Sequence, residues 1–348
     1  MSALKPFFFG LLMALATANS ARAEACGGTY QVKHGDTLSE IAQHQVGTVF
    51  ALHQLIAANP GKIGHNLNQL HVGVVLDLPC RVPMGGFSSD TPFNWSVMPG
   101  AREVVPLMQA NQTQILDIRS MDAIKNGVIP GAIHVPYKAW QTASGTAPNE
   151  AMLAEIYGLS GLRLDQPIVI VNGRATVDDL GAAAFVYWLL KSSGAQQLAI
   201  LRNGHQSWVN ADQPLDAVPA LMDPYEMDVT LAYTWRADAD DIKAITQGTK
   251  VGTVLRASPR ALPIDVTAAP VQPLLATLSG EVDLNDGVSA ILDHLSTYAP
   301  GWQAGPVISM CEELELGALH WFLASELAGQ PDMRFYPKEI SSSVFVSG

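Results

Sequence analysis

The three cysteines of this chain are its most chemically distinctive residues, and their spacing is uneven. Cys26 and Cys80 bracket a short segment, whereas Cys311 lies far along the chain. In an oxidising compartment we expect the first two to form a disulfide, whose loop of about 55 residues corresponds to roughly 4 kcal/mol of stabilisation. The odd third thiol is then inert, intermolecular or reactive. Reactivity requires a thiolate, which is the nucleophile in sulfur chemistry.

The first 23 residues predict export to such a compartment. Lys5 supplies a positive start, residues 6–16 are apolar, and Ala21-Arg22-Ala23 has the small-x-small form of a signal-peptide cleavage site. The apolar run is too short to span a bilayer comfortably, and an uncleaved anchor is the alternative. We therefore expect residues 1–23 to be a signal peptide.

The formal net charge is −12, and loss of Lys5 and Arg22 with the signal peptide changes it to −14. Such an acidic protein is a poor partner for nucleic acid or an anionic lipid surface. No other segment is apolar enough to cross a membrane, so no span is expected after cleavage. The 348 residues, 48% of them hydrophobic, are enough for two or three globular domains.

Residues 26–80 are predicted to form one small unit. Residues 29–32 form a β-prone run, after which Asp36 or Thr37 can cap a helix that carries Leu38. A second helix over residues 52–58 stops at a turn, and a last strand covers residues 74–78. This order resembles the βααβ LysM domain through Tyr30, Val32, Gly35, Asp36, Thr37, Leu38, Ile41, Ala42, Leu55, Asn59, Pro60, Val72, Gly73, Leu76, Leu78 and Pro79.

The LysM resemblance implies binding of peptidoglycan or another glycan that contains N-acetylglucosamine, and hence association with the cell wall of a bacterium. Family members hold the sugar between two loops, whose backbone groups pair with the acetamide while apolar side chains pack on the ring. The alternative is a module that folds without binding. The corresponding residues here are Gly35, Asp36, Thr37 and Leu38 in one loop, and Asn59, Pro60, Gly61 and Ile63 in the other.

Residues 81–104 are rich in Pro, Gly and Ser and predict a linker. Beyond the linker the chain carries a duplicated α/β pattern. Two apolar runs, residues 167–171 and 306–310, are typical of buried parallel strands. Each precedes a Leu-Gly-Ala sequence, an apolar helix, a glycine and another short strand, and the copies lie 139 residues apart at the first strand and 135 at the glycine.

The first copy, residues 105–215, resembles the rhodanese family. The matching motifs are Leu116-Asp117-Ile118-Arg119-Ser120, Gly127-Val128-Ile129-Pro130-Gly131-Ala132-Ile133-His134-Val135-Pro136 and Leu201-Arg202-Asn203-Gly204-His205-Gln206-Ser207-Trp208. The resemblance implies tandem α/β domains with parallel sheets flanked by helices. The second copy, residues 222–345, is degenerate: residues 233–237 stand where the Asp-x-Arg strand is expected, and its Gly-rich turn is not recognisable over residues 252–262.

The rhodanese resemblance also implies a place for the chemistry. In such domains a cysteine follows the central strand, and loop amides at a helix N-terminus stabilise its anion. Asn172 occupies this position in the first copy and Cys311 in the second. The predicted catalytic site is therefore Cys311 with the loop Glu312, Glu313, Leu314, Glu315, Leu316 and Gly317.

The residues around this site limit the chemistry further. Three glutamates beside the thiol raise its pKa and repel a dianionic donor, so a protein persulfide or a small organic thiol suits the loop better than thiosulfate. Gly317 stands where phosphatase-like relatives carry arginine, which disfavours phosphate chemistry. The nine histidines lack metal-ligand spacing, and we expect neither a metal nor a cofactor.

The other candidate residues are most simply interpreted as structural. Arg119 and Arg236 match the family arginine after the first strand and are expected to pair with carboxylates. Trp208 and Trp321 are expected in the core, and His320 on a packed or surface position. A lone cysteine such as Cys311 is often a buried small hydrophobe.

Two function hypotheses remain open. The first is a periplasmic sulfurtransferase held near peptidoglycan, in which Cys311 accepts a sulfane sulfur as a persulfide. The second is a non-catalytic rhodanese-like scaffold tethered to the cell wall, which Asn172 and the eroded second copy favour. A thiol redox role is a third, less favoured hypothesis, because no other cysteine lies near Cys311 in the sequence.

Overall fold

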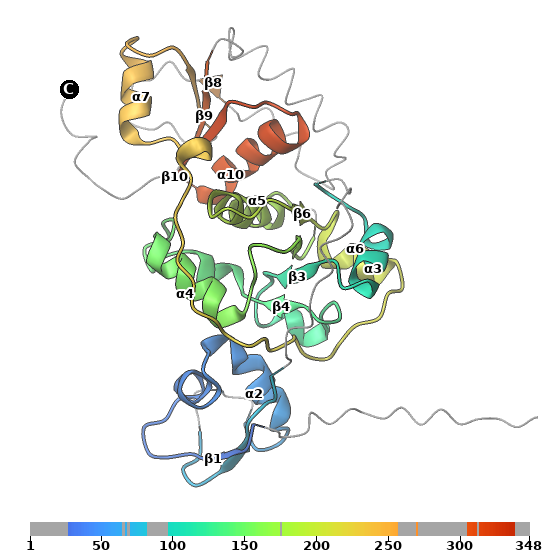
Figure 1. Cartoon of the computed structure of the whole chain (residues 1–348). Helices are drawn as coiled ribbons and strands as arrows, with labels where there is room; N and C mark the ends of the chain where they lie inside the picture. Colours follow the sequence, from blue (N-terminus) through green and yellow to red (C-terminus); the bar gives the residue numbers. More distant parts are fainter. Residues whose placement is uncertain are drawn as a thin grey trace, which may run out of the picture.

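The computed structural model describes residues 27–64, 67, 70–81, 97–174, 176–256, 269–270, 305–311 and 313–337. The predicted signal peptide, Cys26 and Glu312 lie outside these residues. Within them, no helix is both long and apolar enough to cross a bilayer. Figure 1 shows a small N-terminal unit at one end of the molecule, followed by two α/β units.

The N-terminal unit contains β1 (Thr29–Gln31), α1 (Leu38–Ile41), η1 (Ala42–Val46), η2 (Val49–Ala51), α2 (Leu52–Ala58) and β2 (Val75–Asp77). Strands β1 and β2 pair antiparallel, so the predicted order of strand, helix, helix and strand is confirmed. Of the two candidate caps, Thr37 begins α1: its side chain accepts from the Glu40 amide, and the Glu40 carboxylate accepts from the Thr37 amide.

This unit packs against the first α/β unit. The Gln54 side chain donates to the carbonyl oxygens of Pro219 and Ala220, at 3.2 and 3.3 Å. Leu221 is buried in the hydrophobic core of the N-terminal unit itself. Arg81 lies 3.9 Å from Asp223. Residues 219–223 therefore hold the unit through contacts with α2 and its core, and with Arg81 at the start of the predicted linker.

The first α/β unit contains a four-stranded parallel sheet in the order β4-β3-β5-β6. Its elements are α3 (Ala101–Gln109), β3 (Gln114–Asp117), η3 (Ala123–Asn126), β4 (Ile133–His134), η4 (Tyr137–Trp140), α4 (Glu150–Ser160), β5 (Ile168–Val171), α5 (Val177–Ser192), β6 (Leu198–Ile200) and α6 (Gly204–Asn210). Ile115 and Val169 belong to the core on one sheet face, whereas Leu116 and Ile170 belong to the core on the other. Both faces are covered because successive strand residues point to opposite sides.

The predicted linker is too long at its C-terminal end. The Ile200 amide donates to the Val97 carbonyl at 2.8 Å, and the Arg202 amide donates to the Pro99 carbonyl at 2.9 Å. Met98 is buried, and α3 already begins at Ala101. Residues 97–104 thus belong to the first α/β unit, because this Pro- and Gly-containing stretch pairs with the end of β6 and leads into α3.

The second α/β unit repeats the first. It contains η5 (Tyr233–Trp235), α7 (Ala239–Thr246), β7 (Thr253–Arg256), β8 (Ala269–Pro270), β9 (Val307–Cys311), α10 (Leu314–Phe322), η7 (Leu323–Leu327) and β10 (Met333–Pro337). The parallel order β10-β9-β7-β8 corresponds to β6-β5-β3-β4 of the first unit. Both predicted copies therefore have the expected α/β architecture.

One sequence assignment in the second copy is wrong. Residues 233–237 form a short 3-10 helix and a single bridge from Arg236 to Phe335, whereas the counterpart of β3 is β7. Gln114 and Thr253, the first residues of β3 and β7, differ by 139 in number, as Ile168 and Val307 do. The local likeness of residues 233–237 to an Asp-x-Arg strand misled the assignment, and the constant offset identifies the true strand.

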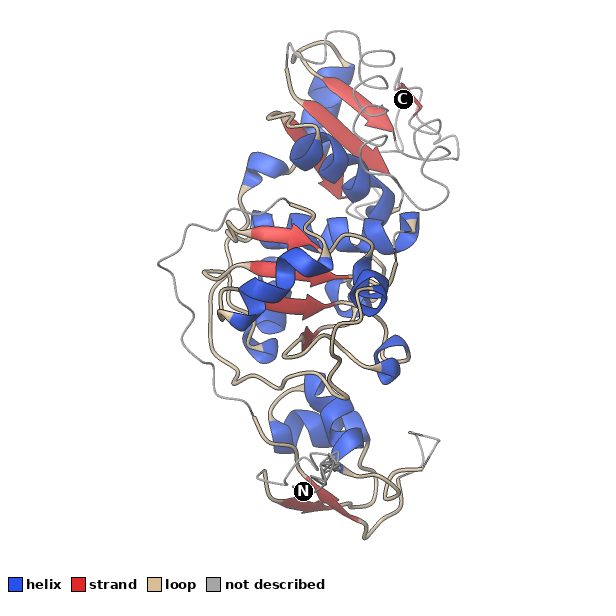
Figure 2. Cartoon of the chain, turned by 90° about the vertical axis from the view of Figure 1, so that its right-hand side faces the viewer, coloured by secondary structure: helices blue, strands red, loops and turns tan. Residues whose placement is uncertain are grey.

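The two α/β units share one hydrophobic core. Helices α5 and α10 lie side by side between the two sheets (Figures 1 and 2). Aromatic side chains from both copies meet there: the rings of Trp188 and Phe335 are 5.1 Å apart, and those of Tyr187 and Phe322 are 5.0 Å apart. The copies therefore stabilise each other through burial of the same apolar surface.

Candidate functional site

Cys311 is the last residue of β9 and lies where this strand passes into α10. The Glu313 amide donates to the Cys311 Sγ at 3.4 Å. Gly317, in the first part of α10, lies against the cysteine: a Cβ added there would be 3.2 Å from the Cys311 Cβ and 2.5 Å from the Phe335 ring. The predicted position at a strand-to-helix junction, with a loop amide directed at the sulfur, is present.

The Cys311 side chain is buried, as the structural interpretation of a lone cysteine predicts. The residue is 2% exposed and belongs to the core that the two copies share. Leu314 and Leu316 of the same loop are also buried, because they face the apolar layer between the sheets. In this conformation the sulfur is not presented to solvent, and any reaction with a bulky donor requires the loop to open.

The described glutamates of the loop have different surroundings. Glu313 is exposed. The Glu315 carboxylate instead accepts from the Tyr137 hydroxyl at 2.7 Å and from the Gln141 amide at 2.9 Å. Burial and the nearby Glu315 raise the pKa of Tyr137, so this hydroxyl stays protonated as a donor. Glu315 thus connects the loop of the second copy to the first copy.

Asn172 stands at the corresponding position of the first copy, at the edge of a cavity of about 870 Å³. The cavity lies at the carboxyl ends of β3 and β5, where ligands of parallel α/β sheets commonly bind. Residues from both copies line it, among them Asn172, Arg174, Asp178, His205, Glu313 and Glu315. Sequence reasoning dismissed Asn172 because it lacks sulfur and did not predict this cavity.

The loop after β5 is closed by its own side chains. The Asn172 side-chain amide donates to the Arg174 carbonyl at 2.8 Å. The Arg174 backbone amide donates to the Asp179 carboxylate at 2.9 Å. The Asp179 carboxylate therefore occupies the Arg174 amide, which would otherwise be available to a bound anion.

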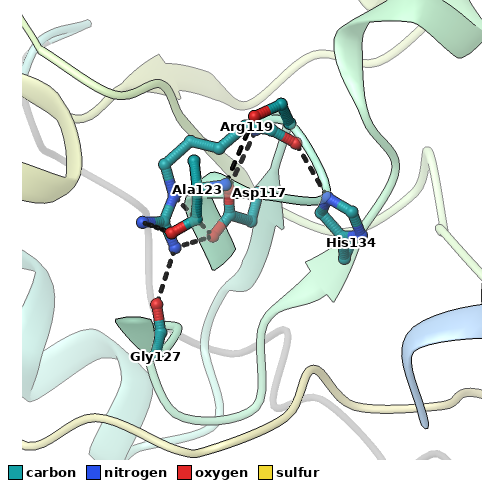
Figure 3. Close-up of polar contacts among 6 residues, drawn as sticks. Asp117, Arg119, Ala123, Gly127 and His134 are labelled. Carbon is teal, nitrogen blue, oxygen red and sulfur yellow. Dashed lines mark hydrogen bonds and ion pairs between the residues drawn. The ribbon is translucent and has the colours of Figure 1, made fainter. Parts of the chain in front are cut away.

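Arg119 has a structural role, as predicted. Its guanidinium donates from Nε and Nη2 to the Asp117 carboxylate and from Nη2 to the Gly127 carbonyl at 2.9 Å (Figure 3). His134 Nε2 donates to the Arg119 carbonyl at 2.8 Å. The pair is nearly fully buried, so it anchors the turn after β3. Arg236 is the C-cap residue of η5 and lies outside the corresponding strand, β7.

Two histidines near the site are buried. Burial, with a smaller contribution from the charge of Arg119, lowers the pKa of His205 to about 4. His320 is fully buried, and its Nδ1 lies 3.0 Å from the Ser309 hydroxyl, so of the two predicted alternatives it is the packed one. Trp208 and Trp321 are core residues, as expected.

The predicted glycan-binding residues fall into two groups. Gly35, Thr37, Pro60 and Gly61 are exposed, and Asp36 and Ile63 are half-buried. Leu38 and Asn59 are buried, which corrects their assignment to a binding surface. The Asn59 side chain donates to the carbonyls of Leu55 and Asp77 and accepts from the Asp77 amide, so it joins α2 to β2.

The cysteines are partly consistent with the predicted pairing. Cys80 is disulfide-bonded, and Cys311 carries a thiol. Because Cys26 lies outside the described residues, the pairing of Cys26 with Cys80 stays a prediction.

Residues 101–211 match the family model of the rhodanese-like domain. The chain contains a rhodanese-like domain. Thiosulfate sulfurtransferase from Bos taurus is 25% identical over 211 residues, which cover 54% of this chain and 66% of the relative. A putative thiosulfate sulfurtransferase from Synechococcus elongatus is 28% identical over 156 residues, which cover 43% of this chain and 47% of the relative. The match thus spans about half to two thirds of the length of these curated relatives.

Solved structures extend the likeness of fold over both copies. SseA from Escherichia coli, a 3-mercaptopyruvate sulfurtransferase with the rhodanese fold, has a TM-score of 0.59 at 18% identity. The match covers 70% of this chain and 98% of SseA. EanB in complex with ergothioneine has a TM-score of 0.55 at 16% identity, with 69% and 66% covered. The tandem arrangement is therefore suggested by structure, and distant homologues are sulfurtransferases.

Proposed function

We propose that this protein is an exported sulfurtransferase of the bacterial periplasm in which Cys311 carries sulfane sulfur as a persulfide. The observation that carries the proposal is the 3.4 Å contact from the Glu313 amide to the Cys311 sulfur at the junction of β9 and α10. Loop amides and the N-terminal end of a helix favour negative charge on sulfur. The rhodanese-like domain and the sulfurtransferase homologues support the reaction class.

The reaction consists of two displacements at sulfur. The Cys311 thiolate attacks the outer sulfur of a persulfide donor, the donor S–S bond breaks, and the donor leaves as a thiolate. An acceptor thiolate then attacks the outer sulfur of the Cys311 persulfide and takes it, which regenerates the Cys311 thiolate. Sulfur is transferred without net oxidation, so no cofactor is required.

The charge near the loop favours a particular donor class. Glu313 is exposed beside the sulfur, and a carboxylate there repels a dianion such as thiosulfate. We propose an organic persulfide as the donor and a thiol as the acceptor, although curated relatives are named for thiosulfate.

A persulfide-transfer assay tests the proposal. Wild type and Cys311→Ser would be compared with cysteamine persulfide, an organic persulfide without net negative charge, and with thiosulfate as donors and a thiol as acceptor. We expect transfer by the wild type, faster from cysteamine persulfide, and none above background by the variant. Glu313→Gln serves as the charge control and should raise the rate with thiosulfate. Equal rates for wild type and Cys311→Ser would refute catalysis by this residue.

Thiol alkylation measures whether the buried sulfur becomes accessible. We expect iodoacetamide to modify Cys311 in the folded protein at least about tenfold more slowly than a free thiol, because local opening must precede reaction. Mass spectrometry identifies the site. Complete protection without denaturant would exclude an enzymatic role for Cys311.

A specific observation favours a second candidate function, a non-catalytic rhodanese-like scaffold. The first copy carries Asn172 in place of a cysteine, and the Cys311 side chain is 2% exposed. In this proposal the acidic loop recognises a partner. The persulfide-transfer assay would then show no activity, and Cys311 would be fully protected from iodoacetamide.

We further propose that the N-terminal unit is a LysM module that holds the protein at peptidoglycan. Its βααβ order and the exposed Gly35, Pro60 and Gly61 support this role. Deletion of the unit would uncover Leu221, so competition is the cleaner test. We expect purified peptidoglycan to retain the protein, N-acetylglucosamine oligomers to release it, and cellulose oligomers to leave it bound. Retention insensitive to both sugars would contradict the proposal.

A further inference from the structure

The cavity of the first copy lies where the second copy has its sulfur. Asn172 follows β5 as Cys311 ends β9, and their residue numbers differ by the repeat offset of 139. The cavity, about 870 Å³, brings together the loop after β5, the start of α6 and two glutamates from the second copy. Its volume is that of a small-molecule site.

The charge of this cavity disfavours anions. Carboxylates of Asp178, Asp179, Glu313 and Glu315 are among the lining groups. Of the lining arginines, Arg119 is already paired with Asp117 at 2.7 Å, which leaves Arg174. Asp179 also accepts from the Arg174 amide at the place where a bound anion would need it. The described lining residues therefore favour a positively charged ligand.

Two buried polar atoms at the cavity have no hydrogen-bond partner in the described part of the protein. Asn172 is 3% exposed and its Oδ1 has none, and His205 is 8% exposed and its Nε2 has none. Buried polar atoms of native proteins nearly always have a partner from protein, water or ligand. Because the Asn172 Nδ2 already donates to the Arg174 carbonyl, the missing group at Oδ1 is a donor.

We propose that this cavity binds a small organic cation with N–H donors, of the guanidinium or amine class. An N–H group donates to the Asn172 Oδ1, and the positive charge faces the exposed carboxylates of Asp178 and Glu313. The cavity shares Glu313 and Glu315 with the Cys311 loop, but cation binding requires no reaction at sulfur, so the proposal stands if sulfur transfer fails.

Isothermal titration of the full mature protein tests the proposal at low ionic strength, where screening is weak. Agmatine is the probe, N-butylurea is its neutral comparator, and sulfate is the anionic one. We expect agmatine to bind, N-butylurea to bind more weakly, and sulfate to give no saturable heat. No binding of agmatine, or tighter binding of sulfate, would overturn the inference.

Variants locate the site. Asp178→Asn combined with Glu313→Gln removes two exposed charges without disturbing the core, and we expect agmatine to bind about fivefold more weakly. Asn172→Leu removes the buried acceptor and should weaken binding at least about tenfold. Asp165→Asn, an exposed carboxylate that does not line the cavity, is the control. Unchanged agmatine affinity in the double variant would place binding elsewhere and refute the assignment.

Discussion

At the scale of single residues, the first copy is organised around a buried ion pair. The side chains of Asp117 and Arg119 are 0% and 5% exposed, and their contact is bidentate. Such a pair is costly to break because the remaining charge is left buried without compensation. The rhodanese-like motif Asp-x-Arg thus has a structural role in this chain, because Arg119 holds the turn that carries Gly127.

Arg119→Met should lower the free energy of unfolding by about 3–5 kcal/mol, because the Asp117 carboxyl group is left buried without its partner. Arg163→Met, in the exposed pair with Asp165, is the control and should change stability by less than about 1 kcal/mol. Urea denaturation followed by circular dichroism gives both values. An equal effect of the two substitutions would show that the buried pair contributes no more than the exposed one.

The lowered pKa of His205 predicts a pH dependence of stability. Above pH 6.5 the imidazole is neutral in both states, whereas between pH 6.5 and about 4 it takes up a proton only in the unfolded chain. Stability should therefore fall as the pH is lowered through this window, with about 2 kcal/mol lost by pH 4.5 from this residue. Burial lowers the pKa of His53 and His134 in the same direction.

The contribution of His205 is isolated by substitution. His205→Gln should reduce the slope of the unfolding free energy between pH 6.5 and about 4, whereas His44→Gln, at an exposed position, should leave it unchanged. Denaturation curves at several pH values measure the slopes. A slope for His205→Gln that matches the wild type would contradict the assigned shift.

At the scale of elements, glycines set how closely the two central helices approach. A Cβ at Gly181 of α5 would lie 2.9 Å from the Glu315 carbonyl oxygen and 3.0 Å from its Cβ. The Leu-Gly-Ala sequence of each copy thus provides a small residue at a tight contact: Gly181 faces α10, and Gly317 faces Cys311 and Phe335. Larger residues would separate the layers of the shared core.

The sign of the stability change in Gly181→Ala tests whether this contact is tight. Alanine in an isolated helix is favoured over glycine by about 1 kcal/mol. The contact with α10 should instead make the substitution destabilising by about 1–3 kcal/mol, because backbone atoms must move. Gly64→Ala, where an added carbon meets nothing within 4 Å, is the control for Gly-to-Ala replacement. Thermal denaturation decides, and a stabilised Gly181→Ala protein would show that the helices tolerate separation.

In the whole molecule, polar and apolar contacts join the two copies. Besides the shared apolar core, Lys191 of α5 contacts Glu326 of η7 at 2.7 Å, and Tyr187 donates to the same carboxylate at 2.9 Å. The Lys191 ammonium also lies 4.3 Å from the centre of the Trp235 ring. Glu326 is largely buried, so these contacts hold the second copy against the first.

Lys191→Met should destabilise the protein by about 3 kcal/mol, since the Glu326 carboxylate loses its cation. Lys125→Met removes the exposed partner of Asp122 and should have little effect. Calorimetry should show one cooperative transition for the wild type and a lower transition temperature for Lys191→Met. Two resolved transitions in the wild type would contradict coupled folding of the copies.

Much of this architecture could be predicted from local patterns. Apolar runs located β5 and β9, and the turn residues after α2 were correct. Arg119 was expected to pair with a carboxylate, and the structure shows that its partner is Asp117. The error at residues 233–237 arose because a short motif was trusted over the repeat offset, which leads to β7. Leu38 and Asn59 were misassigned because sequence does not show which face of a short loop is covered.

The order of elements, the duplication, and the placement of asparagine and cysteine at equivalent strand ends could all be predicted from the amino-acid sequence. These follow from side-chain periodicity and turn chemistry, which act over a few residues. Three features depend on the three-dimensional packing: Cys311 is buried, Asn172 borders a cavity, and residues 219–223 contact the N-terminal unit. They arise from contacts between segments far apart in the chain, such as those of α5 with α10, and local sequence patterns do not specify such contacts.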